Sequence, residues 1–340
     1  MRRQVDQGLA DLYLAERLDA ARVKAATAIR EKLDLARVEL LYASAFAEAG
    51  LGREGDDVET VSANVQKSAV SEEVIAALDD WAAITRDGPR WEWLLAVARK
   101  ADPNPARARL RQPDLWNDGQ QLANLPEDLK VAALSPEMAT ALGRVLRLKD
   151  MDAVPLLTAA QKRARQDFRL NLELGLALDQ GGRSEEAVGY LRAALAVRRE
   201  SSAANNGLGA ALFNLGRTTE ASEHFEEALQ LDPKDSVAHQ NLGVALQFQG
   251  RLDEAIGHFE QALSIDPDFA WAHNNLGAAL ADKGLLDEAI DHFEQALRLD
   301  DPKIAAVCHA NLGTALGKKG RLKEAIEHLQ EAVRLSSNPS

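Results

Sequence analysis

Apolar side chains recur at spacings of three and four along most of the chain, and this spacing is typical of amphipathic α-helices. In the first 50 residues it marks two long helices, ADLYLAERLDAARVKAA and ARVELLYASAFAEAG. Further helices are predicted at about 57–69, 72–86 and 90–101. Together with the abundance of Ala and Leu, the pattern predicts an all-α protein.

Prolines change the pattern after residue 101. They punctuate a more irregular stretch over about 102–133, which also contains Trp116. We interpret this stretch as the end of an N-terminal helical module, residues 1–133, and assign Trp116 to the core of that module. The prolines concerned are Pro103, Pro105, Pro113 and Pro126.

The second half of the chain repeats one sequence with a period of 34 residues. NLGVALQFQGRLDEAIGHFEQALSIDP at 241–267 recurs as NLGAALADKGLLDEAIDHFEQALRLDD at 275–301, and related copies lie on both sides. Each copy reads as two helices, which we name helix A and helix B, and stacked hairpins of this kind form a solenoid. The five predicted repeats are 168–201, 202–235, 236–269, 270–305 and 306–339.

Small residues occupy positions 8, 20 and 27 of every repeat. This pattern resembles the tetratricopeptide-repeat (TPR) family and implies a right-handed superhelix. The glycine at position 8 is expected to lie against the alanine at position 20, while the alanine at position 27 admits the next repeat. The matching residues are Gly175/Ala187/Ala194, Gly209/Ala221/Ala228, Gly243/Ala255/Ala262, Gly277/Ala289/Ala296 and Gly313/Ala325/Ala332.

Three further features refine the repeat array. Residues 134–167 keep the same frame and are interpreted as a degenerate hairpin, with Ser135 as the N-cap of its first helix. The fourth repeat is two residues longer, which predicts a longer connection around Asp301–Ile304. Glycines between helices A and B suit a left-handed helix end; they are Gly182, Gly216, Gly250, Gly284 and Gly320.

Helix A lines the concave groove in the TPR family, and here asparagines recur along it. A carboxamide offers donors and an acceptor to the backbone of an extended peptide. The pattern resembles the asparagine ladder of O-linked N-acetylglucosamine transferases, whose catalytic domain has no counterpart here. Alternatively, asparagine only solvates a common NLG sequence, and Trp271 only packs on the preceding helix B. The predicted groove residues are Asn206, Asn241, Asn275, Asn311, Trp271, Phe213, Phe248, Val244, Gln240 and Asn274.

No motif indicates catalysis, a cofactor or a metal. GxSxG, CxxC, HExxH and Walker sequences do not occur. All seven histidines fall at repeat positions 4 and 23. Because residues related by the repeat translation are a whole hairpin apart, we interpret the histidines as packing residues and predict no metal site. The chain is therefore predicted not to be an enzyme.

Charge and cysteine content limit the partners. The net charge of −13 lies mostly after residue 167 and disfavours nucleic acid and anionic lipid. Cys308 is the single cysteine, so no internal disulfide forms. No apolar run is long enough for a membrane helix or a signal peptide. These observations predict a cytoplasmic protein without membrane insertion.

Residues 8–200 resemble the segment that precedes TPR arrays in planctomycete serine/threonine kinases, through ADLYLAERLDAARV, DDWAAITRD, WEWLLAVARKADPNPARARLR and VAALSP. The chain has no glycine-rich phosphate loop, HRD or DFG motif, so kinase activity is not implied. Two functions stay open. The first is a scaffold that binds an extended protein segment; the alternative is the regulatory or sensor portion of a membrane kinase. The array ends on an uncapped helix B, around Leu322–Leu335, which is expected to allow self-association.

Overall fold

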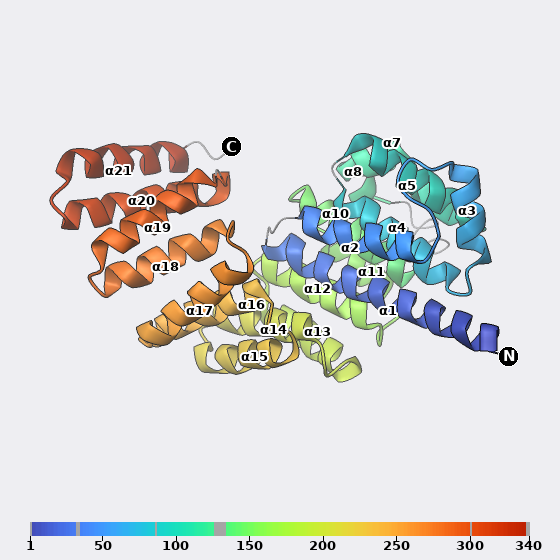
Figure 1. Ribbon diagram of the computed structural model, residues 1–340, viewed down its shortest axis with the longest axis horizontal. Coiled ribbons are helices and arrows are strands. Elements are labelled where there is room, and N and C mark those ends of the chain that lie inside the picture. The colour runs from blue at the N-terminus through green and yellow to red at the C-terminus, as the bar shows by residue number, and fades with distance from the viewer. Residues whose placement is uncertain (1, 32–34, 86, 126–133, 300, 338–340) are drawn as a thin grey trace. The chain divides into compact units, whose positions relative to one another are not determined.

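The computed structural model describes residues 2–31, 35–85, 87–125, 134–299 and 301–337, and its helices are shown in Figure 1. Every regular element in these residues is a helix, which confirms the predicted all-α class. The chain forms two compact units, Met1–Arg199 and Glu200–Ser340. We call them the N-terminal unit and the C-terminal unit and describe each by itself.

The N-terminal unit begins with the five helices that the hydrophobic spacing predicts. Asp57 caps the third of them by accepting a hydrogen bond from the Thr60 amide, and Asp87 caps the fifth through the Arg90 amide. Trp81 is buried between helices and stacks on Tyr42, with ring centroids 5.9 Å apart. The helices are α1 (Arg2–Glu31), α2 (Leu35–Glu48), α3 (Val58–Lys67), α4 (Ser71–Ile84) and α5 (Gly88–Ala101).

The proline-rich stretch is more regular than predicted. It contains three short helices: α6 (Pro105–Leu110), α7 (Pro113–Asn117) and α8 (Gly119–Ala123). Two of the prolines begin a helix instead of ending one, because the first helical position needs no backbone N–H donor. Trp116 is buried, as predicted, and donates its indole N–H to the Leu110 carbonyl oxygen at 2.6 Å. Pro126 and the rest of 126–133 lie outside the described residues.

Four more helices complete the N-terminal unit, and buried ion pairs join them to its first helices. Asp80 on α4 contacts both Arg22 of α1 and Arg144, which lies 2.9 Å away. Arg144 also pairs with Glu173. The compact unit extends to residue 199, and the boundary of an N-terminal module at residue 133 stays a prediction. The added helices are α10 (Pro136–Leu148), α11 (Val154–Gln161), α12 (Phe168–Gln180) and α13 (Ser184–Val197).

The C-terminal unit consists of four helical hairpins, each formed by a helix A and a helix B. Every helix contacts the next one along the chain, and consecutive A helices also contact each other (Figure 1). The glycines between A and B have φ between 74° and 81°, which confirms the predicted left-handed turns. The hairpins are α14 (Ser202–Asn214) with α15 (Thr218–Leu231), α16 (Ser236–Phe248) with α17 (Leu252–Ile265), α18 (Ala270–Asp282) with α19 (Leu286–Arg298), and α20 (Pro302–Lys318) with α21 (Leu322–Ser337).

Glycine at position 8 makes room for an aromatic ring of helix B. A Cβ atom added to Gly243 would lie 2.6 Å from the ring of Phe259, closer than atoms can approach. The same clash would occur between Gly209 and Phe225. The alanine at position 20 is also a close neighbour, as expected, since the added Cβ atom would lie 3.0 Å from the Ala221 carbonyl oxygen at Gly209. The side chain at position 24 comes closer still, because its ring spans the gap between the helices.

Two further observations complete the fold. The extra residues of the fourth repeat do not form a longer connection, because α20 begins at Pro302 and is 17 residues long, whereas α18 has 13. Proline is accommodated in the first turn of the lengthened helix. Among the residues described, none of the helices combines the length and the apolar character that a membrane span requires.

Candidate peptide-binding face

The predicted groove residues lie on α14, α16, α18 and α20, and we call this surface the helix-A face. Its asparagines bind one another across repeats. Asn241 donates a hydrogen bond to Asn206 Oδ1 at 2.9 Å, and Asn311 donates one to Asn274 Oδ1 at 2.9 Å. Asn274 in turn donates to Asn275 Oδ1 at 3.2 Å. The asparagine pattern therefore forms bonded pairs of amides that join consecutive A helices.

The asparagines of the helix-A face differ in burial, which separates two buried side chains from three half-buried ones. Asn206 and Asn274 are 0% and 3% exposed, so they orient the neighbouring amides and do not reach solvent themselves. Asn241, Asn275 and Asn311 are half-buried. Each of these three uses only part of its hydrogen-bonding capacity within the protein, since an amide has two N–H donors and a carbonyl acceptor. Their half-buried positions leave part of each amide accessible.

Two phenylalanines lie side by side on the same face. The rings of Phe213 on α14 and Phe248 on α16 have centroids 5.1 Å apart and meet edge to face at 87°. Phe248 is 75% exposed, which is unusual for a large apolar side chain. Val244 and Gln240, also predicted for the groove, are half-buried on α16. This pair of rings offers an apolar contact next to the amides.

Trp271 is only partly available for binding. One part of its side chain packs on a buried cluster formed by Ala270, Ala296, Ile304 and Cys308. The cluster joins α18 to α19 and α20, so Trp271 packs beside helix B of its own repeat and the next helix A. The remainder of the indole is accessible, because the residue is half-buried.

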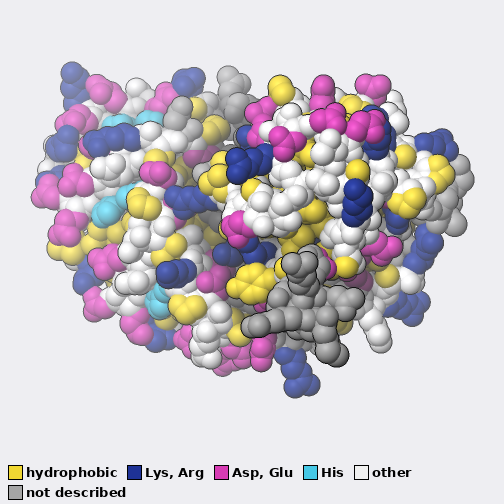
Figure 2. All heavy atoms as spheres, turned by 45° about the vertical axis from the view of Figure 1, so that its right-hand side comes forward, with side chains coloured by type: hydrophobic (Ala, Val, Ile, Leu, Met, Phe, Trp, Pro, Cys, Tyr) yellow, Lys and Arg dark blue, Asp and Glu magenta, His cyan; other side chains and the backbone are white. Residues whose placement is uncertain are grey.

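The histidines at positions 4 and 23 meet in pairs within single repeats. The Nδ1 atoms lie 3.0 Å apart in His239 and His258 and 3.1 Å apart in His273 and His292. In the last repeat the Nδ1 atoms of His309 and His328 are 2.9 Å apart. In the repeat at 202–235, Asn205 replaces the first histidine. Figure 2 shows histidines at the surface among acidic side chains.

The rings of each pair point directly at each other. The ring centroids of His239 and His258 are 5.3 Å apart, and their Nδ1 atoms are 3.0 Å apart. The difference is about twice the distance from the centre of an imidazole ring to its nitrogen, so both nitrogens lie close to the line that joins the two ring centres. Nitrogens that bind one metal ion approach the ion from different directions. This head-on geometry is that of an N–H···N hydrogen bond. In the described part of the chain, no group of three or more His, Cys, Asp or Glu side chains is arranged to hold a metal ion.

A backbone carbonyl determines the tautomers in the pairs of His239 and His273. His239 Nε2 lies 3.2 Å from the Pro233 carbonyl oxygen, which can only accept, so Nε2 carries the proton. Nδ1 of the neutral His239 ring must then accept a hydrogen bond from His258 Nδ1–H. Burial, with the facing His239 ring as the next cause, lowers the pKa of His258. Burial and the facing ring likewise lower the pKa of His292 and of His309.

The pairing was missed by our interpretation of the sequence. We compared histidines that are related by the repeat translation and that are indeed a hairpin apart. The informative signal was the spacing of 19 residues between positions 4 and 23, which joins the two helices of one hairpin. The same repeat positions carry His224 and Asn205, whose Nδ1 and Oδ1 atoms lie 3.0 Å apart.

Comparison with known proteins identifies the repeats. Two sequence profiles of the tetratricopeptide repeat match the chain, one over 151–196 and the other over 200–268 and 268–338. Together these matches cover more than half of the 340 residues. No curated protein matches the chain. The resemblance of residues 8–200 to a kinase-associated segment stays a prediction.

Solved structures with similar folds include proteins described as TPR proteins. One chain of the APC/C hetero-tetramer Cut9-Hcn1 is similar over 94% of this chain and 61% of that chain, with a TM-score of 0.59 and 19% identity. MamA from Desulfovibrio magneticus RS-1 is similar over 51% of this chain and 97% of that chain, with a TM-score of 0.44 and 26% identity. YrrB, described as a TPR protein with an unusual peptide-binding site, is similar over 54% and 93%, with a TM-score of 0.42 and 22% identity. The profile matches and the hairpins show that this chain belongs to the tetratricopeptide-repeat family.

Proposed function

We propose that the chain is a non-enzymatic scaffold that binds an extended segment of a partner protein along the helix-A face. The observation that carries this proposal is the set of half-buried amides on α16, α18 and α20. Asn241 and Asn311 are oriented by buried asparagines of the preceding repeat, and Asn275 by its own neighbour Asn274. Pre-oriented groups lose little conformational entropy on binding, so they contribute more of their hydrogen-bond energy to affinity.

The spacing of the repeats suits an extended backbone. Packed helices have axes about 8–10 Å apart, and an extended chain rises about 3.3 Å per residue. One amide of the helix-A face would therefore meet roughly every third residue of a bound segment. Because these amides bind backbone groups, they impose little sequence preference. Selectivity would come from apolar side chains that contact Phe213, Phe248 and the accessible part of Trp271.

Peptide selection tests the proposal directly. A library of random 12-residue peptides displayed on phage is selected on the full chain, and synthetic copies of the selected peptides are titrated by fluorescence anisotropy. We expect the double variant Asn241→Ala, Asn275→Ala to bind about tenfold more weakly, since each amide hydrogen bond contributes about 0.5–1.5 kcal/mol. N-methylation of the peptide backbone at every third residue should weaken binding in the same way.

A matched variant controls for nonspecific effects. Gln261 is an exposed amide on α17, a B helix, and is not part of the helix-A face. Gln261→Ala should leave peptide affinity unchanged, and all variants should keep the thermal midpoint and far-ultraviolet circular dichroism of the natural chain. If the selected peptides bind the asparagine variant as tightly as the natural chain, the helix-A face is not the binding site.

A second surface supports self-association. On α21 the side chains of Leu322, Ile326, Leu329 and Val333 are between 42% and 66% exposed and form one stripe at helical spacing. The equivalent Ile290 and Phe293 of α19 are buried in the repeat interface. We propose that a second copy of the chain covers the stripe on α21, because the equivalent Ile290 and Phe293 lie buried on α19, which packs against α20.

A further inference from the structure

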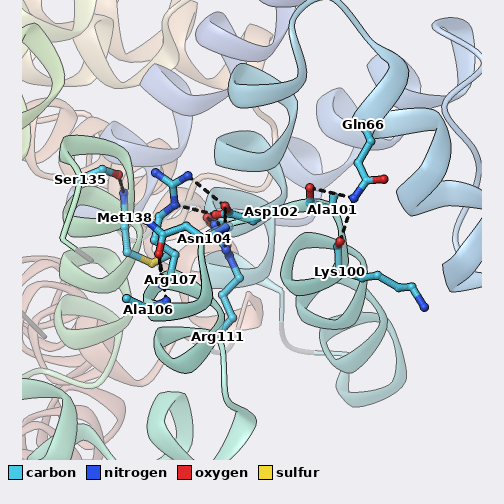
Figure 3. Close-up of polar contacts among 11 residues, drawn as sticks. Gln66, Lys100, Ala101, Asp102, Asn104, Ala106, Arg107, Arg111, Ser135 and Met138 are labelled. Carbon is cyan, nitrogen blue, oxygen red and sulfur yellow. Dashed lines mark hydrogen bonds and ion pairs between the residues drawn. The ribbon is translucent and has the colours of Figure 1, made fainter. Parts of the chain in front are cut away.

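The N-terminal unit contains a pocket whose lining includes no residue of the helix-A face. Its volume is about 370 Å³, which is within the range of small-molecule sites. Helices α1, α4, α10 and α12 and the segment from α5 to α6 contribute to its wall. Figure 3 shows one polar part of this wall, where the Asp102 carboxylate lies between Arg107 and Arg111.

Most charges in the wall are already paired. Arg111 donates two hydrogen bonds to the Asp79 carboxylate, at 2.6 and 2.7 Å, and a third to Asp102 at 2.7 Å. Arg107 binds both oxygens of Asp102, at 2.7 and 2.9 Å. Gln66 donates to the carbonyl oxygens at the end of α5. Because these groups bind one another, they have few hydrogen-bond donors or acceptors left for a ligand.

Arg22 differs from the other arginines of the pocket. It is 2% exposed, and its Nε donates to Asp80. Asp80 also pairs with Arg144, so Arg22 shares its carboxylate with a second guanidinium group. The Nη2 atom of Arg22 has no hydrogen-bond partner although it is buried. A buried N–H donor without a partner is costly, and a carboxylate in the pocket would satisfy it.

The first turn of α4 adds positive potential to the part of the pocket wall that Arg22 forms. Ser71, Glu72 and Glu73 form the first turn of α4 and line the pocket, and the N-cap residue Val70 supplies no side-chain hydrogen bond. The free backbone N–H groups of a first turn and the helix dipole favour an anion. The side chains of Glu72 and Glu73 are exposed and line the pocket, so we assign them to its entrance. The half-buried Glu137 also lines the pocket, where it pairs with Arg169 at 3.8 Å.

We propose that this pocket binds a small zwitterion of the amino-acid class. Its carboxylate accepts from Arg22 Nη2 and lies near the first turn of α4. Its ammonium group faces Glu72 and Glu73 at the entrance. The arrangement of a buried cation below exposed carboxylates discriminates against plain anions, which the entrance repels, and against plain cations, which the interior repels.

Calorimetry of the full chain with matched ligands tests this assignment. Each of the twenty free amino acids is titrated singly at millimolar concentration, and the tightest binder is compared with its N-acetyl and carboxamide derivatives. We expect the carboxamide to bind at least tenfold more weakly, because it loses the charged contact with Arg22, and the N-acetyl form to bind about two- to fivefold more weakly. If none of the twenty binds, or if both derivatives bind as tightly as the free amino acid, the proposal is wrong.

Three variants and one control, Glu92→Gln, test whether these residues form the site. Glu72→Gln with Glu73→Gln should weaken the amino acid about two- to fivefold and should bind the N-acetyl form at least as tightly, because the entrance then repels its carboxylate less. Glu92→Gln, an exposed residue of α5 outside the pocket wall, should change neither affinity. Arg22→Lys removes the free donor, and Ala76→Leu fills the pocket without altering charge. Either should abolish binding at millimolar concentration in protein that keeps its circular dichroism. Full binding by folded Ala76→Leu protein would place the ligand elsewhere and overturn the proposal.

Discussion

The Nδ1 atoms of His239 and His258 face each other at 3.0 Å, and only one of them can carry a proton while that contact lasts. The same pairing occurs in two further repeats. Protonation of the second ring would place two N–H groups and two positive charges head to head. The C-terminal unit therefore contains three contacts that acid weakens.

This arrangement predicts that stability falls with acidification. Burial and the facing ring lower the pKa of His258, His292 and His309 in the folded chain, so the unfolded chain binds more protons than the folded one below its ordinary histidine pKa of about 6.5. Stability contributed by these pairs is present above pH 6.5 and is lost as the pH falls toward the lowered values. Urea denaturation at pH 7.5 and at pH 5 should show a lower midpoint at pH 5.

The chain offers a matched control in the pair of Asn205 with His224, where an amide that cannot be protonated takes the first position. The triple variant His239→Asn, His273→Asn, His309→Asn copies this pair in the other repeats. Its midpoint should depend less on pH than that of the natural chain. An equal loss of stability at pH 5 in both proteins would assign the acid sensitivity to other groups.

Glycine at position 8 should be intolerant of even one methyl group. Gly243→Ala places a Cβ atom against the Phe259 ring, and we expect a loss of about 1–3 kcal/mol in the free energy of unfolding. Gly257→Ala in α17 is the control, since its Cβ meets no atom within 4 Å and alanine favours helix by about 0.5–1 kcal/mol. Chemical denaturation measures both. Equal effects at the two positions would contradict the close approach of the helices.

The buried carboxylate of Asp80 should be essential to the N-terminal unit. Asp80→Asn leaves the guanidinium groups of Arg22 and Arg144 without their shared partner, and we expect destabilisation of about 3–5 kcal/mol. Glu254→Gln removes an exposed partner of Arg251 and should change stability little. Thermal unfolding of the two variants compares them. A small effect of Asp80→Asn would show that the network is dispensable.

Self-association through α21 predicts a concentration-dependent mass. Light scattering after size-exclusion chromatography should show a mass above that of one chain as concentration rises. The double variant Ile326→Glu, Val333→Glu places charge on the exposed stripe and should stay monomeric. Leu231→Glu alters another exposed apolar residue, on α15, and should not change the mass. Association that survives in the double variant would locate the contact on another surface.

The amino-acid sequence by itself determined the fold class, the hairpin turns and the two helices of each repeat. These features depend on short spacings: the apolar period within a helix, glycine at a left-handed turn, and the return of the same pattern after 34 residues. It also predicted that asparagines recur along helix A. Local rules sufficed here, because the residues concerned lie within one or two helical turns of each other or repeat in register.

Tertiary structure alone decided which of these side chains meet. Asn241 binds Asn206 in the preceding repeat, and histidines 19 residues apart form pairs, because the hairpins bring the helices together. Arg144 pairs with Asp80, 64 positions earlier in the chain, and with Glu173, so residues on both sides of the proline-rich stretch belong to one compact unit. Such contacts leave no periodic trace in the chain. They depend on the packing of helices that are distant in sequence, and this packing also creates the pocket beside Arg22.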